Sequence, residues 1–171
     1  MENTLTMAQS LRHARHDFLN ELQLINMNLD LGRIEQAQAI IRSHAEAAVQ
    51  LSRLSALKLP KTEEWLLVSK WRFPELHFEL ACDARKAPVQ RDAEMAEALE
   101  AVVQLLIKQM DPWEKHQSQL MVSADSSWFK IELEVDGKWP DMELPVFSQL
   151  HVGKECKSGR TIFSVRAQME G

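Results

Sequence analysis

The sequence predicts an α+β protein in which an N-terminal antiparallel helical hairpin is followed by a C-terminal α/β sandwich. Two patterns predict this fold class. Apolar residues recur at alternating three- and four-residue steps in the first third of the chain, as on a bundle helix. The remainder mixes period-two strand patterns with one long helical pattern, and it holds all five tryptophans. We assign the hairpin to residues 1–59 and the α/β domain to residues 60–171.

The first helix is expected to begin near Thr4 or Thr6 and to end at Leu31, where Gly32 can adopt the left-handed conformation that terminates helices. One side of this helix carries an apolar seam, formed by Leu11, Phe18, Leu22, Ile25 and Leu29. A second apolar stripe lies off that seam and consists of Leu24, Met27 and Leu31. A single partner helix does not cover both stripes.

The second helix is expected over Ile34–Leu57 and is rich in alanine, which permits close helix packing. Pro60 stops it, and a polar linker between the two domains is expected over Lys58–Glu64. A hairpin with two apolar stripes would be covered by a second copy of itself. The sequence thus predicts a homodimer with a four-helix bundle, unless the C-terminal domain covers the second stripe.

In the C-terminal domain, one helix and four strands are expected. They are a strand over His77–Cys82, the helix over Asp92–Met110, a strand pair over Gln119–Ala124 and Trp128–Val135, and a last strand over Thr161–Ala167. The tryptophans and methionines are interpreted as core residues, except that Trp139 beside Pro140 is expected to be exposed.

The composition excludes several classes of protein. The chain has 171 residues and a formal net charge of −5 without a basic block or finger motif, so no nucleic-acid binding is expected. No apolar run approaches the roughly 20 residues that span a bilayer, so no membrane insertion is expected. Two cysteines without a CxxC pair, and the lack of a signal peptide, favour a reduced cytoplasmic location.

His16 is the residue with the clearest chemistry. It lies one position off the apolar seam, beside Arg15, so its imidazole is expected to face water. A neutral imidazole has a lone pair that can attack phosphorus without a separate base. Asp17 could fix its tautomer, and the guanidinium groups of Arg12 and Arg15 could neutralise a phosphoryl group. A metal site at His13 and His16 would need further ligands, and the other histidines are scattered singly.

The segment Arg15–Ile25, closed by Leu29–Arg33, resembles the phosphoacceptor helix of the sporulation initiation phosphotransferases of spore-forming bacilli. A similar Arg-His-Asp pattern occurs in the helical hairpin of citrate- and malate-type sensor kinases. The acceptor histidine of the family maps onto His16 and not onto His13. The resemblance implies a cytoplasmic relay protein that takes phosphate from the aspartate of one response regulator and gives it to that of another.

We therefore predict that His16 is the phosphoacceptor of a dimeric histidine phosphotransferase in a sporulation phosphorelay. The groups that orient the ring or the phosphoryl group would be Arg15, Asp17 and Asn20. The surface that docks the response regulators would include Arg12, His13, Leu19 and Gln23. The regulator would bring its own aspartate and Mg²⁺, so no cofactor and no metal site are expected in this chain.

The C-terminal pattern looks like a reduced histidine-kinase ATP-binding domain, but it lacks the residues that hold nucleotide. Every asparagine belongs to the first helix, so the helix predicted over Asp92–Met110 has none to hold Mg²⁺. Where paired glycines would follow the strand pair, the chain reads Asp136-Gly137-Lys138-Trp139-Pro140. We expect a degenerate domain that binds no ATP. Two alternatives stay open: a module that binds a response regulator without transferring phosphate, and the detached core of a citrate-type sensor kinase.

Overall fold

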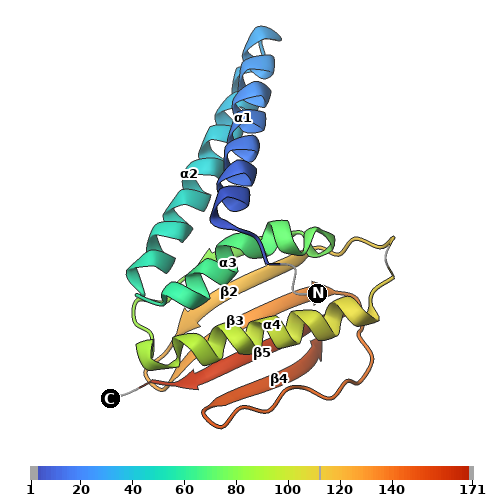
Figure 1. The fold of residues 1–171 in the computed structure, drawn as a ribbon. Coiled ribbons are helices and arrows are strands. Elements are labelled where there is room, and N and C mark those ends of the chain that lie inside the picture. Colours follow the sequence, from blue (N-terminus) through green and yellow to red (C-terminus); the bar gives the residue numbers. More distant parts are fainter. Residues whose placement is uncertain (1–3, 112, 170–171) are drawn as a thin grey trace. The chain divides into compact units, whose positions relative to one another are not determined.

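A computed structural model describes residues 4–111 and 113–169, and the chain divides into two compact units, Met1–Val49 and Gln50–Gly171. The predicted fold class is confirmed: a helical hairpin is followed by a domain built on a mixed β-sheet (Figure 1). The first unit contains helix α1 (Met7–Asp30) and the greater part of helix α2 (Ile34–Ala56). None of the helices in the described residues is both long and apolar enough to cross a membrane.

Both ends of α1 follow from local sequence chemistry. Thr6 is the N-cap, and its hydroxyl accepts the backbone N–H of Gln9 at 3.2 Å while the Gln9 side chain accepts the backbone N–H of Thr6 at 2.8 Å. At the other end Gly32 has a φ of 69°, a conformation that favours glycine. The backbone N–H of Arg33 then donates to the carbonyl of Asn28 at 2.8 Å. The predicted start at Thr6 and the turn at Gly32 are confirmed.

The hairpin buries a narrow strip of α1 that differs from the predicted apolar seam. The less exposed residues of α1 are Ser10, Asp17, Glu21, Ile25 and Asn28, and from Asp17 onward they recur at four- and three-residue steps. On α2, Ala37 is buried and Ile40 half-buried. Four of the five seam residues remain exposed in the single chain, because one neighbouring helix covers only one face; they are Leu11 (64%), Phe18 (50%), Leu22 (41%) and Leu29 (49%).

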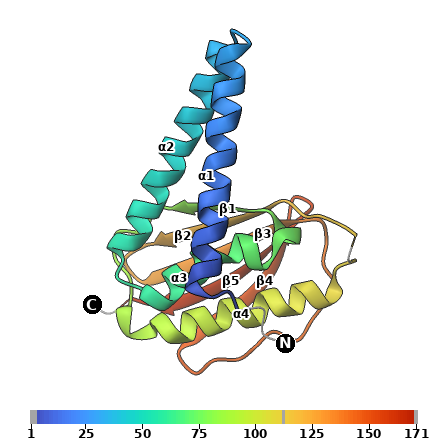
Figure 2. The ribbon, with the colours of Figure 1, turned by 45° about the horizontal axis from the view of Figure 1, so that its top comes forward.

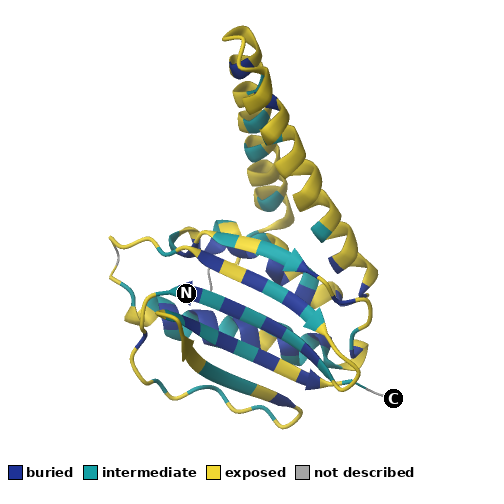
Figure 3. Ribbon diagram, turned by 180° about the vertical axis from the view of Figure 1, so that it is seen from behind, coloured by how far each residue is buried: buried dark blue, intermediate teal, exposed yellow. Residues whose placement is uncertain are grey.

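The second unit is a five-stranded sheet with helices on one face. Its strands are β1 (Phe78–Cys82), β2 (Ser118–Ala124), β3 (Trp128–Asp136), β4 (Leu150–Lys157) and β5 (Arg160–Gln168). Their order is β1-β2-β3-β5-β4, and β1 runs parallel to β2 whereas the other neighbours are antiparallel. Helices α3 (Pro60–Arg72) and α4 (Asp92–Gln109) cover one face (Figure 2). No helix of the described residues in this unit lies on the other face (Figure 3).

The core of this unit lies between the sheet and the two helices. Along β3, alternate residues are fully buried, namely Phe129, Ile131, Leu133 and Val135. Along β5, Phe163, Val165 and Ala167 repeat the pattern. Alternation of this kind places every second side chain in the core and the others on the helix-free face.

Two elements differ from the sequence prediction. The segment expected as a linker over Lys58–Glu64 instead enters α3 at Pro60, because proline is well tolerated in the first turn of a helix, where its missing N–H has no partner to lose. Strand β4 was not predicted. It is an edge strand that pairs only with β5, and most of its residues are polar or exposed, so the period-two signal is weak.

The expectation for the tryptophans is wrong at two positions. Trp139 is buried at 9% exposure, and its ring lies 5.0 Å from that of His116. Its indole N–H donates to the carbonyl of Asp136 at 3.1 Å. A tryptophan beside proline can therefore pack when its one polar atom finds an acceptor. Trp113, predicted to be core, is 93% exposed.

Polar contacts fix α3 against α4. The carboxylate of Asp92, the first residue of α4, accepts the backbone N–H groups of Lys61 (2.9 Å) and Thr62 (2.8 Å) at the start of α3. Further along, the guanidinium of Arg72 donates two hydrogen bonds to Glu100, at 2.8 and 2.7 Å. The indole N–H of Trp65 donates to the same carboxylate at 2.7 Å. The carboxylates of Asp92 and Glu100 thus connect both ends of α3 to α4.

Candidate functional site

His16 lies on an exposed surface of α1, as its position in the sequence indicates. Its Nδ1 is 3.2 Å from Nδ2 of Asn20, one helical turn later, within hydrogen-bond distance. In the imidazole ring Nε2 lies on the side remote from Nδ1. A contact that occupies Nδ1 therefore leaves Nε2 as the ring nitrogen that can meet an incoming group.

The other predicted site residues share α1 with His16. All of them are exposed except Asp17, which is half-buried. One turn from His16 in either direction lie Arg12, His13, Leu19 and Asn20, whereas Gln23 is two turns away on the same face. Asp17 belongs to the buried strip of the hairpin described above. The arrangement therefore offers a broad exposed helix face around the ring.

A contact between the two helices was missing from the sequence prediction. Nδ1 of His44, on α2, contacts the Glu21 carboxylate of α1. The ring of His44 also lies 6.3 Å from that of Phe18. Both side chains of this contact are about half exposed, at 50% for His44 and 41% for Glu21. The pairing depends on the register of the antiparallel helices, so no local motif in the sequence could have indicated it.

The described residues contain no group of three or more His, Cys, Asp or Glu side chains that could hold a metal ion. The predicted site residues carry two imidazoles, two guanidinium groups and two side-chain amides, together with the half-buried carboxylate of Asp17. An exposed neutral imidazole among cationic side chains is suited to attack an anionic electrophile such as a phosphoryl group.

One protein-family model matches the N-terminal helices of the chain. Residues 1–57 match the family model of the Sensor_kinase_SpoOB-type alpha-helical domain. The match covers α1, Gly32 and α2, and thus every predicted site residue, but it ends before α3 and the strands of the sheet. Among curated proteins no match was found.

Solved structures of histidine kinases resemble the chain weakly. The Acinetobacter baumannii histidine kinase AdeS is 11% identical, with 91% of this chain and 98% of that chain covered and a TM-score of 0.45. The catalytic domain of histidine kinase ThkA is 15% identical over 68% of this chain and 92% of that chain, with a TM-score of 0.45. A crystal structure of ThkA in complex with response regulator protein TrrA is 11% identical over 94% of this chain, with a TM-score of 0.47, and the match spans 61% of that chain.

Proposed function

We propose that this chain is a histidine phosphotransferase that carries a phosphoryl group on His16 between the aspartates of two response regulators, in a bacterial sporulation phosphorelay. The observation that carries the proposal is an exposed imidazole whose Nδ1 lies 3.2 Å from the Asn20 amide, on a helix that matches a sensor-kinase helical domain. A cytoplasmic location belongs to the same proposal.

Transfer requires a lone pair on the outward nitrogen of the ring. When the Asn20 amide is turned by 180°, its Oδ1 accepts the Nδ1–H of His16, and Nε2 then carries the free lone pair. This Nε2 attacks the phosphorus of an aspartyl phosphate, the bond from phosphorus to the aspartate oxygen breaks, and the carboxylate leaves. The phosphohistidine then gives its phosphoryl group to a second aspartate by the reverse steps. The Mg²⁺ for both steps comes from the regulators.

Charge and shape suit the face around His16 to a response regulator. Arg12 and Arg15 are exposed beside the ring and would offset the negative charge of the transferred group. Leu19 is 49% exposed and adds an apolar contact next to the histidine. His13 and Gln23 complete the docking face. Asp17, which belongs to the buried strip of the hairpin, would help to orient the helix face that carries His16.

The proposal includes a homodimer in which two hairpins form a four-helix bundle. The apolar seam and the second stripe of α1 are both exposed in the single chain; Leu24, Met27 and Leu31 are 46%, 48% and 58% exposed. Replacing Leu22 with glutamate should dissociate the dimer, because the bundle would bury an unpaired charge. Sedimentation at micromolar concentration measures the change. A wild-type chain that sediments as a helical monomer would contradict the bundle.

The phosphotransfer proposal is tested by incubating the chain with radiolabelled phosphorylated response regulators from the same organism. His16→Gln should abolish labelling and transfer, whereas His13→Gln, the matched control three residues earlier, should only weaken them. The label should be acid-labile and alkali-stable, as expected for a phosphoramidate. If the wild-type chain binds a phosphorylated regulator tightly but never takes up label, the non-transferring binding module is the correct interpretation.

A thermal-shift titration with ATP and Mg²⁺ separates the proposal from a sensor kinase. The helix α4 has no asparagine, and its Gln104 side chain instead donates to Glu100 at 3.0 Å. We expect no change in melting temperature, because a ligand stabilises a protein only if it binds the folded state. A melting temperature that rises with ATP concentration would favour the detached core of a citrate-type kinase.

A further inference from the structure

The helix-free face of the sheet carries basic side chains opposite one another at one end. The strand register places Arg166 of β5 between His151 of β4 and Lys130 of β3. These side chains face away from the core, because Phe129 and Ile131 on either side of Lys130 are buried. Two like charges directly opposite each other destabilise a sheet. Folding alone therefore gives no reason for Arg166 and Lys130 to be neighbours.

At the other end of the same face, a basic side chain lies opposite an acidic one. There Arg160 of β5 lies opposite Asp136 of β3, and its guanidinium is 2.7 Å from the carboxylate of Glu134. At the basic end, Lys130 has one counter-charge, since its ammonium lies 3.0 Å from Asp125. Arg166 has no carboxylate partner among the described residues and lies 5.9 Å from the centre of the Trp128 ring.

The Asp125 carboxylate binds backbone groups of its own turn as well as Lys130. It accepts the backbone N–H groups of Ser127 and Trp128, each at 2.8 Å. Hydrogen bonds from the backbone of Ser127, from Lys130 and from the backbone of Trp128 lower the pKa of Asp125 to about 2, so it is ionised at neutral pH. The carboxylate is therefore held at the turn between β2 and β3 by contacts other than Arg166.

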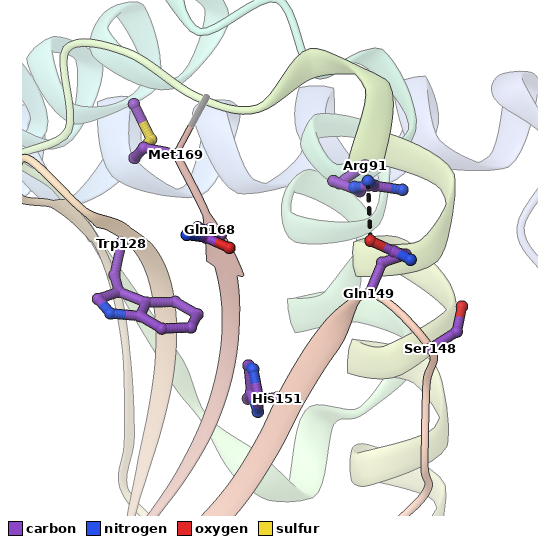
Figure 4. Close-up of a pocket in the computed structure, with 7 residues that line it drawn as sticks. All are labelled: Arg91, Trp128, Ser148, Gln149, His151, Gln168 and Met169. Carbon is purple, nitrogen blue, oxygen red and sulfur yellow. Dashed lines mark hydrogen bonds between the residues drawn. The ribbon is translucent and has the colours of Figure 1, made fainter. Parts of the chain in front are cut away.

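A cavity of about 270 Å³ lies beside Trp128 at this end of the sheet (Figure 4). Its lining combines the indole with Arg91, Gln149, His151 and Gln168. The ring of His151 stands edge-on to the indole, with centroids 5.2 Å apart and planes at 78°. Arg91 donates to the Gln149 side chain at 3.0 Å and thereby connects the segment before α4 to the segment before β4.

A second cavity lies on the helix-free face of the sheet. This cavity of about 190 Å³ is lined by Arg166, Lys130 and Gly153, and also by the acidic residues Glu132 and Glu155. A Cβ atom at Gly153 would come within 3.1 Å of the Ser164 hydroxyl, so glycine leaves space there. Arg166 thus borders the second cavity and also lies 5.9 Å from the centre of the Trp128 ring, which borders the first.

We propose that this end of the sheet unit binds a small organic anion that carries a planar ring. The ring would pack against Trp128, and the anionic group would meet Arg166 with the help of His151. The side-chain amides of Gln149 and Gln168 would take the polar substituents of the ligand. A volume of about 270 Å³ falls just below the usual range of ligand pockets, about 300–1,000 Å³, which favours a compact ligand over a macromolecule.

The test uses 2-naphthoate as the probe and follows the indole N–H signals of the full-length protein by nuclear magnetic resonance. Trp128→Phe identifies the Trp128 signal by its disappearance. Naphthoate should shift this signal saturably, with millimolar or better affinity, while the uncharged 2-naphthalenemethanol should shift it far less. Failure of naphthoate to give a saturable shift of Trp128 would overturn the proposal.

Two arginine variants complete the test. Arg166→Gln should weaken naphthoate binding about tenfold, a loss of about 1.4 kcal/mol. Arg160→Gln, on the same strand and face but paired with Glu134, should leave it unchanged. Arg166→Gln should also not lower the melting temperature, because it relieves a repulsion with Lys130. Equal loss in both variants, or a Trp128 shift with polyglutamate but not with naphthoate, would contradict a small-molecule site.

Discussion

The two units of this chain contrast in where their apolar side chains lie. In the sheet unit, leucine, valine and phenylalanine side chains of β3 and β5 are almost completely buried. In the hairpin, most of the large apolar side chains of α1 are between 41% and 81% exposed, although their spacing is as regular (Figure 3). Regular apolar spacing therefore indicates burial against something, but it does not indicate whether the partner is in the same chain.

The sharpest test of this contrast is the same substitution in each unit. Leu133→Ala in β3, where the side chain is 2% exposed, should lower the free energy of unfolding by about 2–5 kcal/mol at any protein concentration. Leu22→Ala in α1, which is 41% exposed, should mainly weaken dimerisation. Its effect on melting temperature should therefore depend on concentration. If Leu22→Ala lowered the stability as much as Leu133→Ala, and did so at every protein concentration, the contrast between the two units would not hold.

A smaller effect is expected where α3 meets α4. Arg72 is 8% exposed and bonds to Glu100, which is 30% exposed. Breaking a buried ion pair usually lowers the free energy of unfolding by about 3–5 kcal/mol. Arg72→Met leaves the Glu100 carboxylate without its charged partner, but Trp65 and Gln104 still donate to it, so the loss should not exceed the lower end of that range. Denaturant unfolding measures the loss. Adding Glu100→Gln should restore part of the stability, and no recovery would contradict this account.

The Asp92 carboxylate should contribute less. It accepts two backbone N–H groups at the start of α3, where no side chain of α3 itself provides a cap. Asp92→Ala should lower the free energy of unfolding by about 1–2 kcal/mol, as for other lost caps. Asp83→Ala, at an exposed position, is the matched control and should change it by less than about 0.5 kcal/mol. Similar losses in both variants would show that the cap is unimportant.

The smallest expected effect is a pH dependence from Glu100. Burial raises the pKa of this carboxyl, but hydrogen bonds from Arg72, Trp65 and Gln104 outweigh burial and lower it below its ordinary value. A lowered pKa in the folded state stabilises the protein above the ordinary glutamate pKa of about 4.3, and that stabilisation is lost as the pH falls further. The stability difference between wild type and Glu100→Gln should therefore shrink between pH 5 and pH 3. A constant difference would contradict the lowered pKa.

The fold was predictable wherever one short segment carries its own signal. Thr6 and Gly32 mark the ends of α1 by capping chemistry, and the strand pair around Asp125 follows from alternation on both sides of a turn. Strand β4 was not predictable in this way, because an edge strand shows little alternation. Helix α3 was hidden by Pro60, which marks a helix start as readily as a break.

For the candidate site, the sequence predicted that His16 is exposed and that Asn20 lies one turn from it, and both features are present. The contact of Glu21 with His44 was not predictable, since it joins positions that only the hairpin register brings together. The surroundings of Trp128 were not predictable for the same reason. They assemble from β3, β4 and β5, and no local pattern records which strands become neighbours.

The parallel pairing of β1 with β2 has a consequence for the order of folding. The strand pairs β2–β3 and β4–β5 are joined by short turns, so each can form quickly and locally. Strand β1 cannot pair with β2 until the whole of α4 has crossed between them. We expect the strand pairs β2–β3 and β4–β5 to form early. The pairing of β3 with β5 should follow, and β1 should join the sheet last.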